Sequence, residues 1–594
     1  MCGIAGYIGG RNVSDVLFNM LKRLEYRGYD SAGVAIVDKE GLFVAKNKGR
    51  VEGIEGEMLR TCDRTKIHSS LGMGHCRWAT HGVPSKKNAH PHTDCKGKFV
   101  VVHNGIIENY KDLKQELIGK GHKFESETDT EVIPHLIEEF YTGDFEAAFI
   151  EAIKKLKGSF AIAAITPTEA DKILMTRKES PLIVGLGKNE NFVASDIPAV
   201  LPETKRVIIL QDFDYGIIRE NSVVIKDLKT GAQVERETQI VEWDIREAEK
   251  AGYEHFMLKE IFEEPYAAKN ALKGVKEIKE VAKKLAHFKR IYFVACGTAA
   301  YAGLVGKYLL ERFGISSEAV MASEFRYSTA NTLYEDCAVI AISQSGETAD
   351  TIACAREAKR RNSRVVSVVN VVGSTLTRLS DDNVYIYAGP EIAVASTKAY
   401  IGQLVSLTLL SLFLAKERGK INDESVEEIL SDLKEIPDKI GQILSDEREI
   451  RKLAENLADK NIFFYIGRRL NYPTALEGAL KIKEISYVHA EAYPAGELKH
   501  GPLALLEEGV PVVAISPNDD LASKMESNIE EAKARNATVL LVSEGGDLNI
   551  PAVNPLLSPI LCIVPLHLFA YYISVSKGID PDRPRNLAKS VTVE

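Results

Sequence analysis

The sequence predicts an α+β domain at the N-terminal end, followed by two α/β domains with doubly wound parallel sheets. Three observations predict this arrangement. Residues 1–240 alternate short apolar runs with turn signals, and residues 240–289 are mostly charged and helix-favouring. The rest of the chain contains an internal repeat in which continuous apolar strands alternate with helices. At 594 residues the chain is too long for one hydrophobic core, so several domains are expected.

The composition is that of an ordinary globular protein in a reducing compartment. The net charge of -9 argues against a general binder of nucleic acid or of membrane surfaces. The cysteines are scattered, and no positively charged leader precedes an apolar core. Residues 555–575 form the most apolar stretch, but prolines and His567 interrupt it, which favours a buried helix or strand pair over a membrane span. We therefore expect a cytoplasmic protein.

The first third of the chain is rich in predicted strands. Short apolar runs such as residues 2–9 and 99–105 predict strands, and two amphipathic stretches, about 12–26 and 130–157, predict helices. Many strands with few helices indicate a layered α+β domain whose sheets are largely antiparallel.

Cys2 follows the initiator methionine directly. If Met1 is removed, the chain begins with a free α-amine beside a thiol, and that amine can act as the base toward its own side chain. The ordinary pKa of an α-amine suits a base near neutral pH. The alternative is a chance cysteine at the start of a strand, and Cys2 alone does not decide between the two.

Polar clusters interrupt the predicted strands at residues 26–31, 74–82, 90–92, 103–109 and 126–131. Loops on a rigid scaffold commonly carry chemistry. One alternative for these clusters is a metal site formed by their histidines and nearby cysteines, but the spacing matches no paired ligand pattern, so we predict no metal. The residues considered for it are His75, Cys76, His81, His90, His92, Cys95 and His103.

With Cys2, these clusters supply the groups that amide hydrolysis needs. The Asn104 side-chain amide and the Gly105 backbone N–H could stabilise an oxyanion, although Asn-Gly is equally typical of a hairpin turn. Arg77 could grip the carboxylate of an amino-acid substrate, and Asp129 could pair with its ammonium group.

The motifs MCGIxG, YRGYDSAG, RWATHG, HNGIIEN and SETDTE resemble the N-terminal-nucleophile glutamine amidotransferase family, over a domain of residues 2–240. The resemblance implies a four-layer α-β-β-α fold and hydrolysis of glutamine to ammonia. It also implies Cys2 as nucleophile, an oxyanion hole at Asn104 and Gly105, and a channel gate at Trp78. The residues that it implies for glutamine binding are Arg77, Thr80, His81 and Asp129.

Residues 241–284 are expected to form a helical linker. Apolar residues recur at helical spacing until Pro265, which should stop or kink the helix. The many charges indicate a solvated face, and we assign this segment no catalysis.

The internal repeat lies in the last two thirds of the chain. Residues 290–297 resemble 461–467, and residues 338–343 resemble 511–516. In each copy an apolar strand, a turn with glycine and a helix precede another apolar strand, which predicts parallel sheets. The two domains are expected over residues 285–425 and 455–585.

The first copy continues into a hydroxyl-rich turn at residues 343–351, SQSGETADT. At the carboxyl end of a parallel strand, such a turn offers hydroxyls, backbone N–H groups and a helix dipole to an anion. The alternative is an N-cap cluster, but this number of hydroxyls exceeds what capping requires. The second copy has SPNDD at residues 516–520, so we predict one phosphate site per chain, in the first copy.

The second copy carries acid–base groups instead. Glu477, Lys481 and Glu484 share one predicted helix face, where a surface salt-bridge ladder is the alternative to a functional cluster. His500 follows in the segment GELKHGP. The chain ends in a polar tail, residues 586–594, and such tails are normally frayed.

The motifs CGT, SQSGETADT, VASTKA, LEGALKxKEISY, AEAYxAGELKHGP and LAKSVTVE resemble a pair of sugar isomerase (SIS) domains. Together with the first domain, the whole chain resembles the family of glutamine–fructose-6-phosphate aminotransferases (isomerizing). The resemblance implies that His500 assists ring opening, Glu484 moves a proton between C1 and C2, and Lys589 in the catalytic tail forms a Schiff base. The sugar-phosphate ligands that it implies are Thr298, Ser343, Gln344, Ser345, Thr348, Val394, Ala395 and Ser396.

One position departs from the family pattern. Ala299 follows Thr298 where the family more often has serine, which removes a hydroxyl at the sugar site. Contacts to the sugar are therefore less well defined there than elsewhere.

The resemblance implies conversion of L-glutamine and fructose 6-phosphate to glutamate and glucosamine 6-phosphate, in amino-sugar biosynthesis. We expect no cofactor, no nucleic-acid or membrane partner, and a homodimer or higher oligomer. One alternative is another N-terminal-cysteine amidotransferase, such as those of purine or asparagine synthesis, against which the turn at 343–351 and Lys589 argue. Another is a sugar-phosphate-binding regulator, which would not need Glu484, His500 and Lys589.

Overall fold

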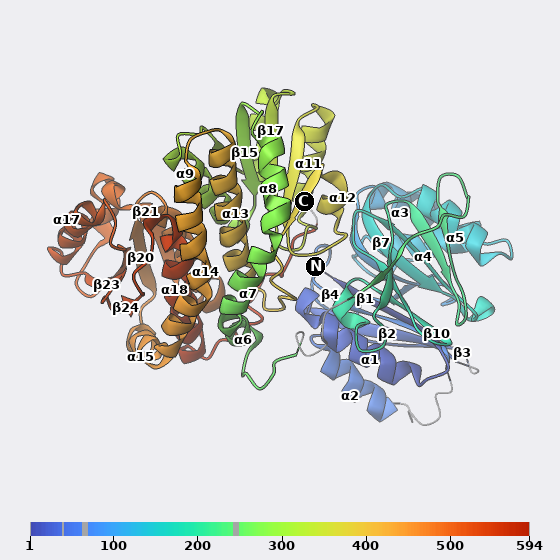
Figure 1. Cartoon of the computed structure of the whole chain (residues 1–594). Coiled ribbons are helices and arrows are strands. Elements are labelled where there is room, and N and C mark those ends of the chain that lie inside the picture. Colours follow the sequence, from blue (N-terminus) through green and yellow to red (C-terminus); the bar gives the residue numbers. More distant parts are fainter. Residues whose placement is uncertain (1, 39–40, 62–68, 242–248, 593–594) are drawn as a thin grey trace. The chain divides into compact units, whose positions relative to one another are not determined.

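A computed structural model describes residues 2–38, 41–61, 69–241 and 249–592 (Figure 1). The chain divides into two compact units. Unit 1 comprises Met1–Ile245 with Ser590–Glu594, and unit 2 comprises Arg246–Lys589. Expectations for Met1, Cys62, residues 242–248 and residues 593–594 fall outside the described residues.

Unit 1 contains two antiparallel sheets, as the alternation of its apolar runs predicts. The eight-stranded sheet has the order β14-β11-β9-β10-β1-β4-β2-β3 and the six-stranded sheet the order β13-β12-β8-β7-β6-β5. The first sheet consists of β1 (Gly3–Gly9), β2 (Ser31–Asp38), β3 (Gly41–Lys48), β4 (Leu71–Arg77), β9 (Ile183–Leu186), β10 (Glu190–Ala194), β11 (Arg206–Ile209) and β14 (Thr238–Ile240). The second consists of β5 (His92–Thr93), β6 (Val100–Ile107), β7 (Gly158–Ile165), β8 (Ile173–Lys178), β12 (Asp214–Ile218) and β13 (Val223–Asp227).

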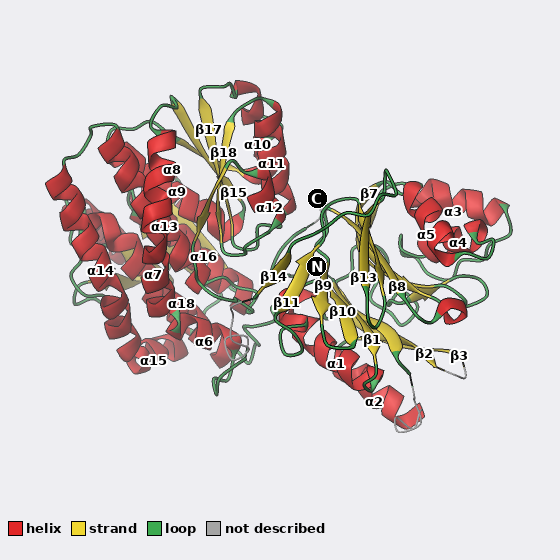
Figure 2. Cartoon of the chain, turned by 45° about the vertical axis from the view of Figure 1, so that its right-hand side comes forward, coloured by secondary structure: helices red, strands yellow, loops and turns green. Residues whose placement is uncertain are grey.

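Three apolar cores separate four layers in unit 1. One core joins α1 (Val13–Leu24) and α2 (Val51–Thr61) to the eight-stranded sheet. A second lies between the two sheets, and a third joins the six-stranded sheet to α3 (Tyr110–Gly119), α4 (Val132–Phe140) and α5 (Phe145–Lys154). Figure 2 shows the two groups of helices on opposite sides of the strands. The α-β-β-α fold is confirmed.

The helices of unit 1 are more numerous than the sequence predicted. The stretch 130–157 is two helices, α4 and α5, separated at a turn where Gly143 has a φ of +111°. Helices α2 and α3 were not predicted. In α3 charged side chains dominate and only Leu113 and Leu117 are buried, so its apolar periodicity is short.

Unit 2 contains two five-stranded parallel sheets, which confirms the repeat. Their orders, β16-β15-β17-β18-β19 and β21-β20-β22-β23-β24, are the same 2-1-3-4-5 arrangement. The first sheet consists of β15 (Arg290–Ala295), β16 (Glu318–Met321), β17 (Cys337–Ser343), β18 (Arg364–Val369) and β19 (Asp382–Tyr385). The second consists of β20 (Ile462–Gly467), β21 (His489–Pro494), β22 (Pro511–Ile515), β23 (Thr538–Ser543) and β24 (Leu548–Asn549).

One continuous apolar core joins both sheets of unit 2 to most of its helices, and two smaller cores join the other helices to the sheets. Helices α13 and α18 are long and apolar enough to cross a membrane, but 100% and 94% of their most apolar windows are buried in this core. The stretch 555–575 is therefore a buried helix. The helices of unit 2 are α6 (Phe256–Phe262), α7 (Glu264–Ala271), α8 (Val275–Leu285), α9 (Gly297–Arg312), α10 (Ala322–Phe325), α11 (Ala349–Arg360), α12 (Thr375–Leu379), α13 (Lys398–Glu417), α14 (Asp423–Ser445), α15 (Glu447–Leu457), α16 (Asn471–Ser486), α17 (Ala522–Lys533) and α18 (Ser558–Ser576).

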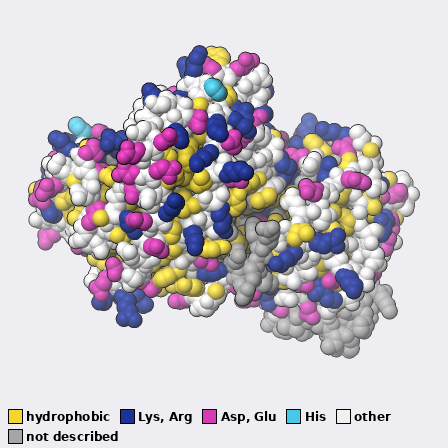
Figure 3. Space-filling model, in the orientation of Figure 1, with side chains coloured by type: hydrophobic (Ala, Val, Ile, Leu, Met, Phe, Trp, Pro, Cys, Tyr) yellow, Lys and Arg dark blue, Asp and Glu magenta, His cyan; other side chains and the backbone are white. Residues whose placement is uncertain are grey.

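The segment expected as a solvated linker contributes to this core. Helix α6 ends at Phe262, and Pro265 lies in the first turn of α7, as the sequence predicted. However, α6, α7 and α8 bury apolar residues in the core, and Glu260 and Glu264 are buried as well. The expectation of a mainly solvated segment was wrong for these helices, because their apolar residues and two of their glutamates are buried. At the surface shown in Figure 3, basic and acidic side chains are interspersed.

Candidate active sites

Cys2 lies at the start of β1, beside the end of β4. Its Sγ is 3.4 Å from both the backbone nitrogen and the carbonyl oxygen of Trp78. The Cys2 carbonyl accepts hydrogen bonds from Arg27 Nε at 3.1 Å and from Asn104 Nδ2 at 3.0 Å. The thiol and the Asn104 amide of the predicted oxyanion hole are therefore neighbours. The α-amine that would act as base depends on removal of Met1, which lies outside the described residues.

The Asn104 amide is oriented by a buried histidine. His75 Nε2 lies 3.0 Å from both the His103 carbonyl oxygen and Asn104 Oδ1. Both partners are acceptors, so Nε2 carries the proton. Burial lowers the pKa of His75 to about 3, which keeps the ring neutral. Asn104 Nδ2 is then the end of the amide that faces Cys2, and it also donates to Ser195 Oγ at 2.7 Å.

Gly105 lies within strand β6 and not in a hairpin turn. It pairs with Phe160 of β7, so the hairpin alternative for Asn104–Gly105 is wrong. Its φ is +124°, and a Cβ would lie 2.1 Å from the Ser159 carbonyl oxygen. Only glycine fits this strand position without strain.

Arg77 and Asp129 are both buried, and Arg77 interacts electrostatically with both Cys2 and Asp129. Arg77 Nη2 donates to the carbonyls of His81 and Gly82, while its Nη1 has no hydrogen-bond partner among the described residues. Asp129 Oδ2 accepts the N–H of Ile107 at 2.8 Å. Burial lowers the pKa of Arg77, although nearby negative groups oppose this effect. A buried guanidinium with a free N–H can bind a carboxylate.

A cavity of about 20 Å³ lies beside Cys2, which is room for little more than one water molecule. Glutamine needs more space, so the lining must open for it to enter. Arg77, His81 and Asp129 are not among the lining residues. Those residues are Cys2, Arg27, Trp78, Thr80, Asn104, Gly105, Pro181, Val591 and Thr592.

In unit 2 the hydroxyl-rich turn connects β17 to α11. Ser343 Oγ lies 2.8 Å from Thr348 Oγ1 and accepts the Gly346 N–H at 3.1 Å. Ser345 Oγ accepts the Glu347 N–H at 3.1 Å. Thr348 is at the N-cap of α11, but its side chain makes no capping hydrogen bond. The capping alternative therefore does not explain this hydroxyl.

Thr298 belongs to a buried cluster with α16. Its hydroxyl donates to Glu477 Oε1 at 3.0 Å and accepts from Lys481 Nζ at 3.1 Å. Lys481 also pairs with Glu477 at 3.2 Å and with Glu484. Glu477 and Lys481 are fully buried, so a surface salt-bridge ladder is the wrong interpretation. Burial raises the pKa of Glu477 to about 7 against the opposing charge of Lys481.

Lys589 lies against a different carboxylate. Its Nζ pairs with Glu391 Oε2, which also accepts the Ser396 hydroxyl at 2.8 Å. Glu391 Oε1 accepts the backbone N–H groups of Thr397 and Ala399, at the start of α13. Burial alone would raise the pKa of Glu391, but Lys589 and these donors lower it to about 2. The tail lysine is thus held in place, and not frayed.

The remaining predicted residues differ in exposure. Val394 and Ala395 are buried, and the Val394 N–H donates to the Asp582 carbonyl at 3.3 Å. Gln344 is half-buried at the end of β17. His500 is exposed, whereas Glu484 pairs with Lys481. For His500 to assist ring opening of the sugar, its segment must move or a further contact must bring it to the sugar.

Sequence reasoning missed several groups that position these residues. His75 and Ser195 fix the Asn104 amide, and Arg27 holds the Cys2 backbone. Glu391 holds Lys589. The acidic residue in EIAVASTKA, just before the predicted sugar contacts, was the available signal for Glu391. No signal of comparable strength marked Ser195.

Comparisons with known proteins cover both units. Residues 75–202 match the family described as a glutamine amidotransferase domain, and residues 284–412 and 456–550 match the SIS domain. The chain is 51% identical over 606 residues to the glutamine–fructose-6-phosphate aminotransferase [isomerizing] of Thermococcus kodakarensis, and 52% identical over 608 residues to that of Pyrococcus horikoshii. Each alignment covers 100% of both chains.

A solved structure is similar to part of the chain. It is the C-terminal domain of glucosamine-fructose-6-phosphate aminotransferase from Francisella tularensis, with 39% sequence identity and a TM-score of 0.54. The match covers 57% of this chain and 100% of that one.

Proposed function

The chain belongs to the family of glutamine–fructose-6-phosphate aminotransferases (isomerizing), and we propose that Cys2 and Lys589 carry its two half-reactions. The enzyme hydrolyses L-glutamine and transfers the ammonia to fructose 6-phosphate, giving glutamate and glucosamine 6-phosphate. The observation that best supports the assignment within unit 1 is the Asn104 amide, which His75 turns toward Cys2.

In unit 1 the Cys2 thiolate attacks the side-chain carboxamide carbon of glutamine. The α-amine, free after removal of Met1, takes the thiol proton and returns it to the leaving ammonia. Asn104 Nδ2 and the Gly105 N–H stabilise the tetrahedral oxyanion. Water then hydrolyses the thioester to release glutamate.

Arg77 and Asp129 bind the two charged ends of the substrate. Arg77 Nη1 is buried without a hydrogen-bond partner among the described residues, so a substrate carboxylate would satisfy it. Asp129 pairs with the ammonium group, while Thr80 and His81 line the glutamine site. Trp78 contacts Cys2 directly through its backbone, which suits the role of a gate for ammonia.

In unit 2 the turn after β17 binds the phosphate through Ser343, Gln344, Ser345 and Thr348, and Thr298, Val394, Ala395 and Ser396 contact the sugar. Hydroxyls and backbone N–H groups at the start of α11 are suited to an anion. His500 assists ring opening. Lys589 Nζ attacks the C2 carbonyl of the open ketose and forms a Schiff base with loss of water.

Ammonia then replaces Lys589 at C2, and Glu484 moves a proton from C1 to C2, which gives the 2-amino aldose phosphate. A path that excludes water keeps ammonia unprotonated. No cofactor is needed for these steps. We further propose a cytoplasmic homodimer or higher oligomer.

A Cys2→Ala variant tests the division of labour. It should lose glutamine-dependent glucosamine 6-phosphate but still isomerise fructose 6-phosphate to glucose 6-phosphate, as measured by coupled assay and mass spectrometry. Wild-type protein that releases no glutamate from glutamine, with or without fructose 6-phosphate, would contradict the proposal. Protein that retains Met1, checked by mass analysis, should lack glutaminase activity and keep isomerase activity.

A further inference from the structure

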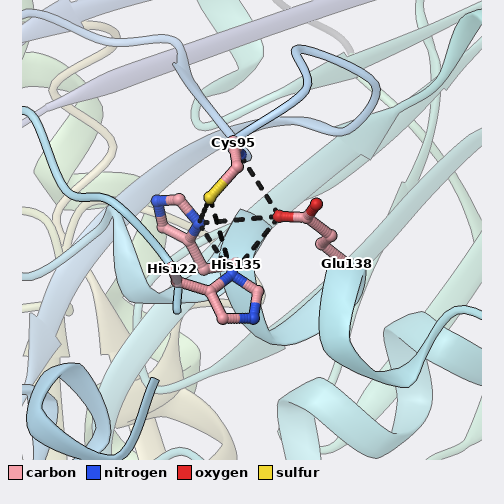
Figure 4. A group of neighbouring side chains, drawn as sticks. All are labelled: Cys95, His122, His135 and Glu138. Atoms are coloured by element: carbon pink, nitrogen blue, oxygen red, sulfur yellow. Dashed lines mark hydrogen bonds and ion pairs between the residues drawn. The ribbon is translucent and has the colours of Figure 1, made fainter. Parts of the chain in front are cut away.

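Four side chains converge in unit 1 at a place separate from the cavity beside Cys2 (Figure 4). Cys95 lies in the turn between β5 and β6, and His122 follows α3. His135 and Glu138 lie one turn apart on α4. One possible ligand atom from each residue lies within 4.8 Å of the other three.

The separations are those of a tetrahedral zinc site. Zinc bonds of about 2.3 Å to sulfur and about 2.0 Å to nitrogen place ligand atoms roughly 3.3–3.6 Å apart. Cys95 Sγ lies 3.7 Å from His122 Nδ1 and 3.5 Å from His135 Nδ1, and the two Nδ1 atoms are 3.3 Å apart. Glu138 Oε2 lies 3.3 Å from His122 Nδ1 and 3.9 Å from His135 Nδ1.

The two imidazoles face each other through their Nδ1 atoms, and the buried His135 Nε2 has no hydrogen-bond partner among the described residues. His122 Nε2 forms a hydrogen bond with Glu139 Oε2 at 3.3 Å. His135 Nε2 is 3.7 Å from Glu131 Oε1, which is near that carboxylate but beyond hydrogen-bond distance. A neutral imidazole that directs its Nε2–H to a carboxylate has a lone pair on Nδ1. The two Nδ1 lone pairs would then repel each other at this distance. A cation between them removes the conflict, and a carboxylate behind each histidine is the usual support for a metal ligand.

The neighbouring charges leave one carboxylate oxygen for the ion. Lys96 Nζ pairs with Glu138 Oε1 at 3.1 Å, while Oε2 accepts the Cys95 N–H at 3.2 Å and faces the histidines. His135 is buried and the His122 side chain is only 9% exposed, whereas Cys95 is exposed, so the cluster lies at the surface with its two histidines shielded from water.

We propose that Cys95, His122, His135 and Glu138 bind a structural Zn²⁺ ion. Sulfur and imidazole ligands select zinc over the hard cations Mg²⁺ and Ca²⁺, which prefer oxygen. Four protein ligands complete a tetrahedron and leave no open position for a reacting water, so the ion is structural and not catalytic.

The ion would join the segments that carry the glutamine site. Cys95 precedes β6, which holds Asn104 and Gly105. His122 and His135 flank residues 123–131, where Asp129 accepts the Ile107 N–H. A metal ion that links these segments favours the folded state, because its four ligands are brought together only there. Bound zinc should therefore stabilise unit 1 against unfolding.

Metal content and unfolding temperature test the proposal on the full chain. After treatment with a chelator and dialysis, Zn²⁺ should rebind at one equivalent per chain, measured by inductively coupled plasma mass spectrometry. At a thousandfold excess over Kd it should raise the unfolding temperature of unit 1 by roughly 10 °C, whereas Mg²⁺ should not. Wild-type protein that binds no zinc at this stoichiometry would overturn the proposal.

Matched cysteine variants identify the ligands. Bound Co²⁺ should give a thiolate-to-cobalt charge-transfer band and intense visible bands in the wild type and in Cys2→Ala. Cys95→Ser should lose the charge-transfer band and bind Zn²⁺ at least about 100-fold more weakly. His122→Gln should weaken binding similarly, which serves as a second test if Cys95→Ser folds poorly, and His489→Gln, an exposed histidine of unit 2, is the control. A band that persists in Cys95→Ser, or disappears in Cys2→Ala, would contradict the assignment.

Discussion

At the scale of single residues, buried groups that do not react determine how the reactive groups are presented. His75 receives no solvent, and its only proton lies on Nε2, between the His103 carbonyl and Asn104 Oδ1. It therefore fixes which end of the Asn104 amide meets Cys2. Glu391 plays the corresponding part for Lys589, since it holds the Nζ atom through an ion pair.

Substitution of His75 should reduce glutamine hydrolysis without removing the nucleophile. His75→Ala frees the Asn104 amide to rotate, and we expect kcat to fall by roughly 10- to 100-fold, less than the loss of about 100- to 1,000-fold for Asn104→Ala. Because both act on one donor, the double variant should be no worse than Asn104→Ala. Steady-state release of glutamate measures all three, and multiplicative losses would show that His75 acts elsewhere.

At the scale of secondary-structure elements, the periodicity of the sequence predicted most of the strands but not all of the helices. Apolar runs such as residues 338–343 predict the strands of unit 2, because a strand buried on both faces is continuously apolar. Helix α3 was missed because its stripe is only Leu113 and Leu117. The charged sequence at 256–285 predicts solvated helices, because the sequence does not distinguish a buried Glu260 or Glu264 from exposed glutamates.

The same limit applies to the sites. The motifs predicted Cys2, Asn104, Ser343 and Lys589, whose residue types carry the chemistry directly. His75 and the group around His135 depend on which strands and helices meet, and sequence spacing does not record that. The first and last of the proposed zinc ligands, Cys95 and Glu138, are 43 positions apart, and only one pair among the four lies at helical spacing.

The turn between β17 and α11 gives a prediction about sugar-phosphate binding. Thr348→Val removes a hydroxyl that is paired with Ser343 but does not cap the helix. A lost hydrogen bond to a charged phosphate should raise KM for fructose 6-phosphate about tenfold or more, while glutamine hydrolysis without sugar stays unchanged. Thr408→Val is the matched control, because that hydroxyl donates only to the Leu404 carbonyl within α13. An unchanged KM would place the phosphate elsewhere.

Helix α6 gives a prediction about pH. Glu260 Oε1 accepts the N–H groups of Ile392 and Ala393, and burial and the neighbouring Glu391 raise the pKa of Glu260 to about 8. In the unfolded chain the pKa of Glu260 is near 4.5. Between pH 4.5 and about 8 the folded chain therefore keeps a proton on Glu260 that the unfolded chain has lost. The stabilisation from this proton is complete below the pKa of Glu260 in the unfolded chain, and it is lost as pH rises through about 8.

Glu260→Gln removes that dependence, because the amide is neutral at every pH and keeps the carbonyl acceptor. The variant and wild type should unfold at similar temperatures near pH 5. At pH 8.5 the variant should unfold roughly 5 °C higher, since each unit of pKa shift corresponds to about 1.4 kcal/mol. Scanning calorimetry over this range measures the effect, and a difference that does not change with pH would contradict the assignment.

At the scale of the whole molecule, the last residues of the chain belong to both units. Lys589 lies in unit 2, whereas residues from Ser590 onward belong to unit 1, where Val591 and Thr592 line the cavity beside Cys2. Cys2 and, from the other end of the described chain, Val591 and Thr592 therefore line the same small cavity. That cavity is too small for glutamine, so entry of the substrate requires its lining to move.

Deletion of residues 591–594 should open the cavity while leaving Lys589 in the chain. We expect KM for glutamine to fall and hydrolysis without sugar phosphate to rise by several-fold, because the lining no longer has to move. The ratio of glutamate to glucosamine 6-phosphate should then exceed one, as measured by quantifying both products in the same reaction. The double variant V591A/T592A shortens the two side chains without shortening the chain, and it should give a smaller change in the same direction. A ratio that stays at one in both variants would show that the tail does not restrict access to Cys2.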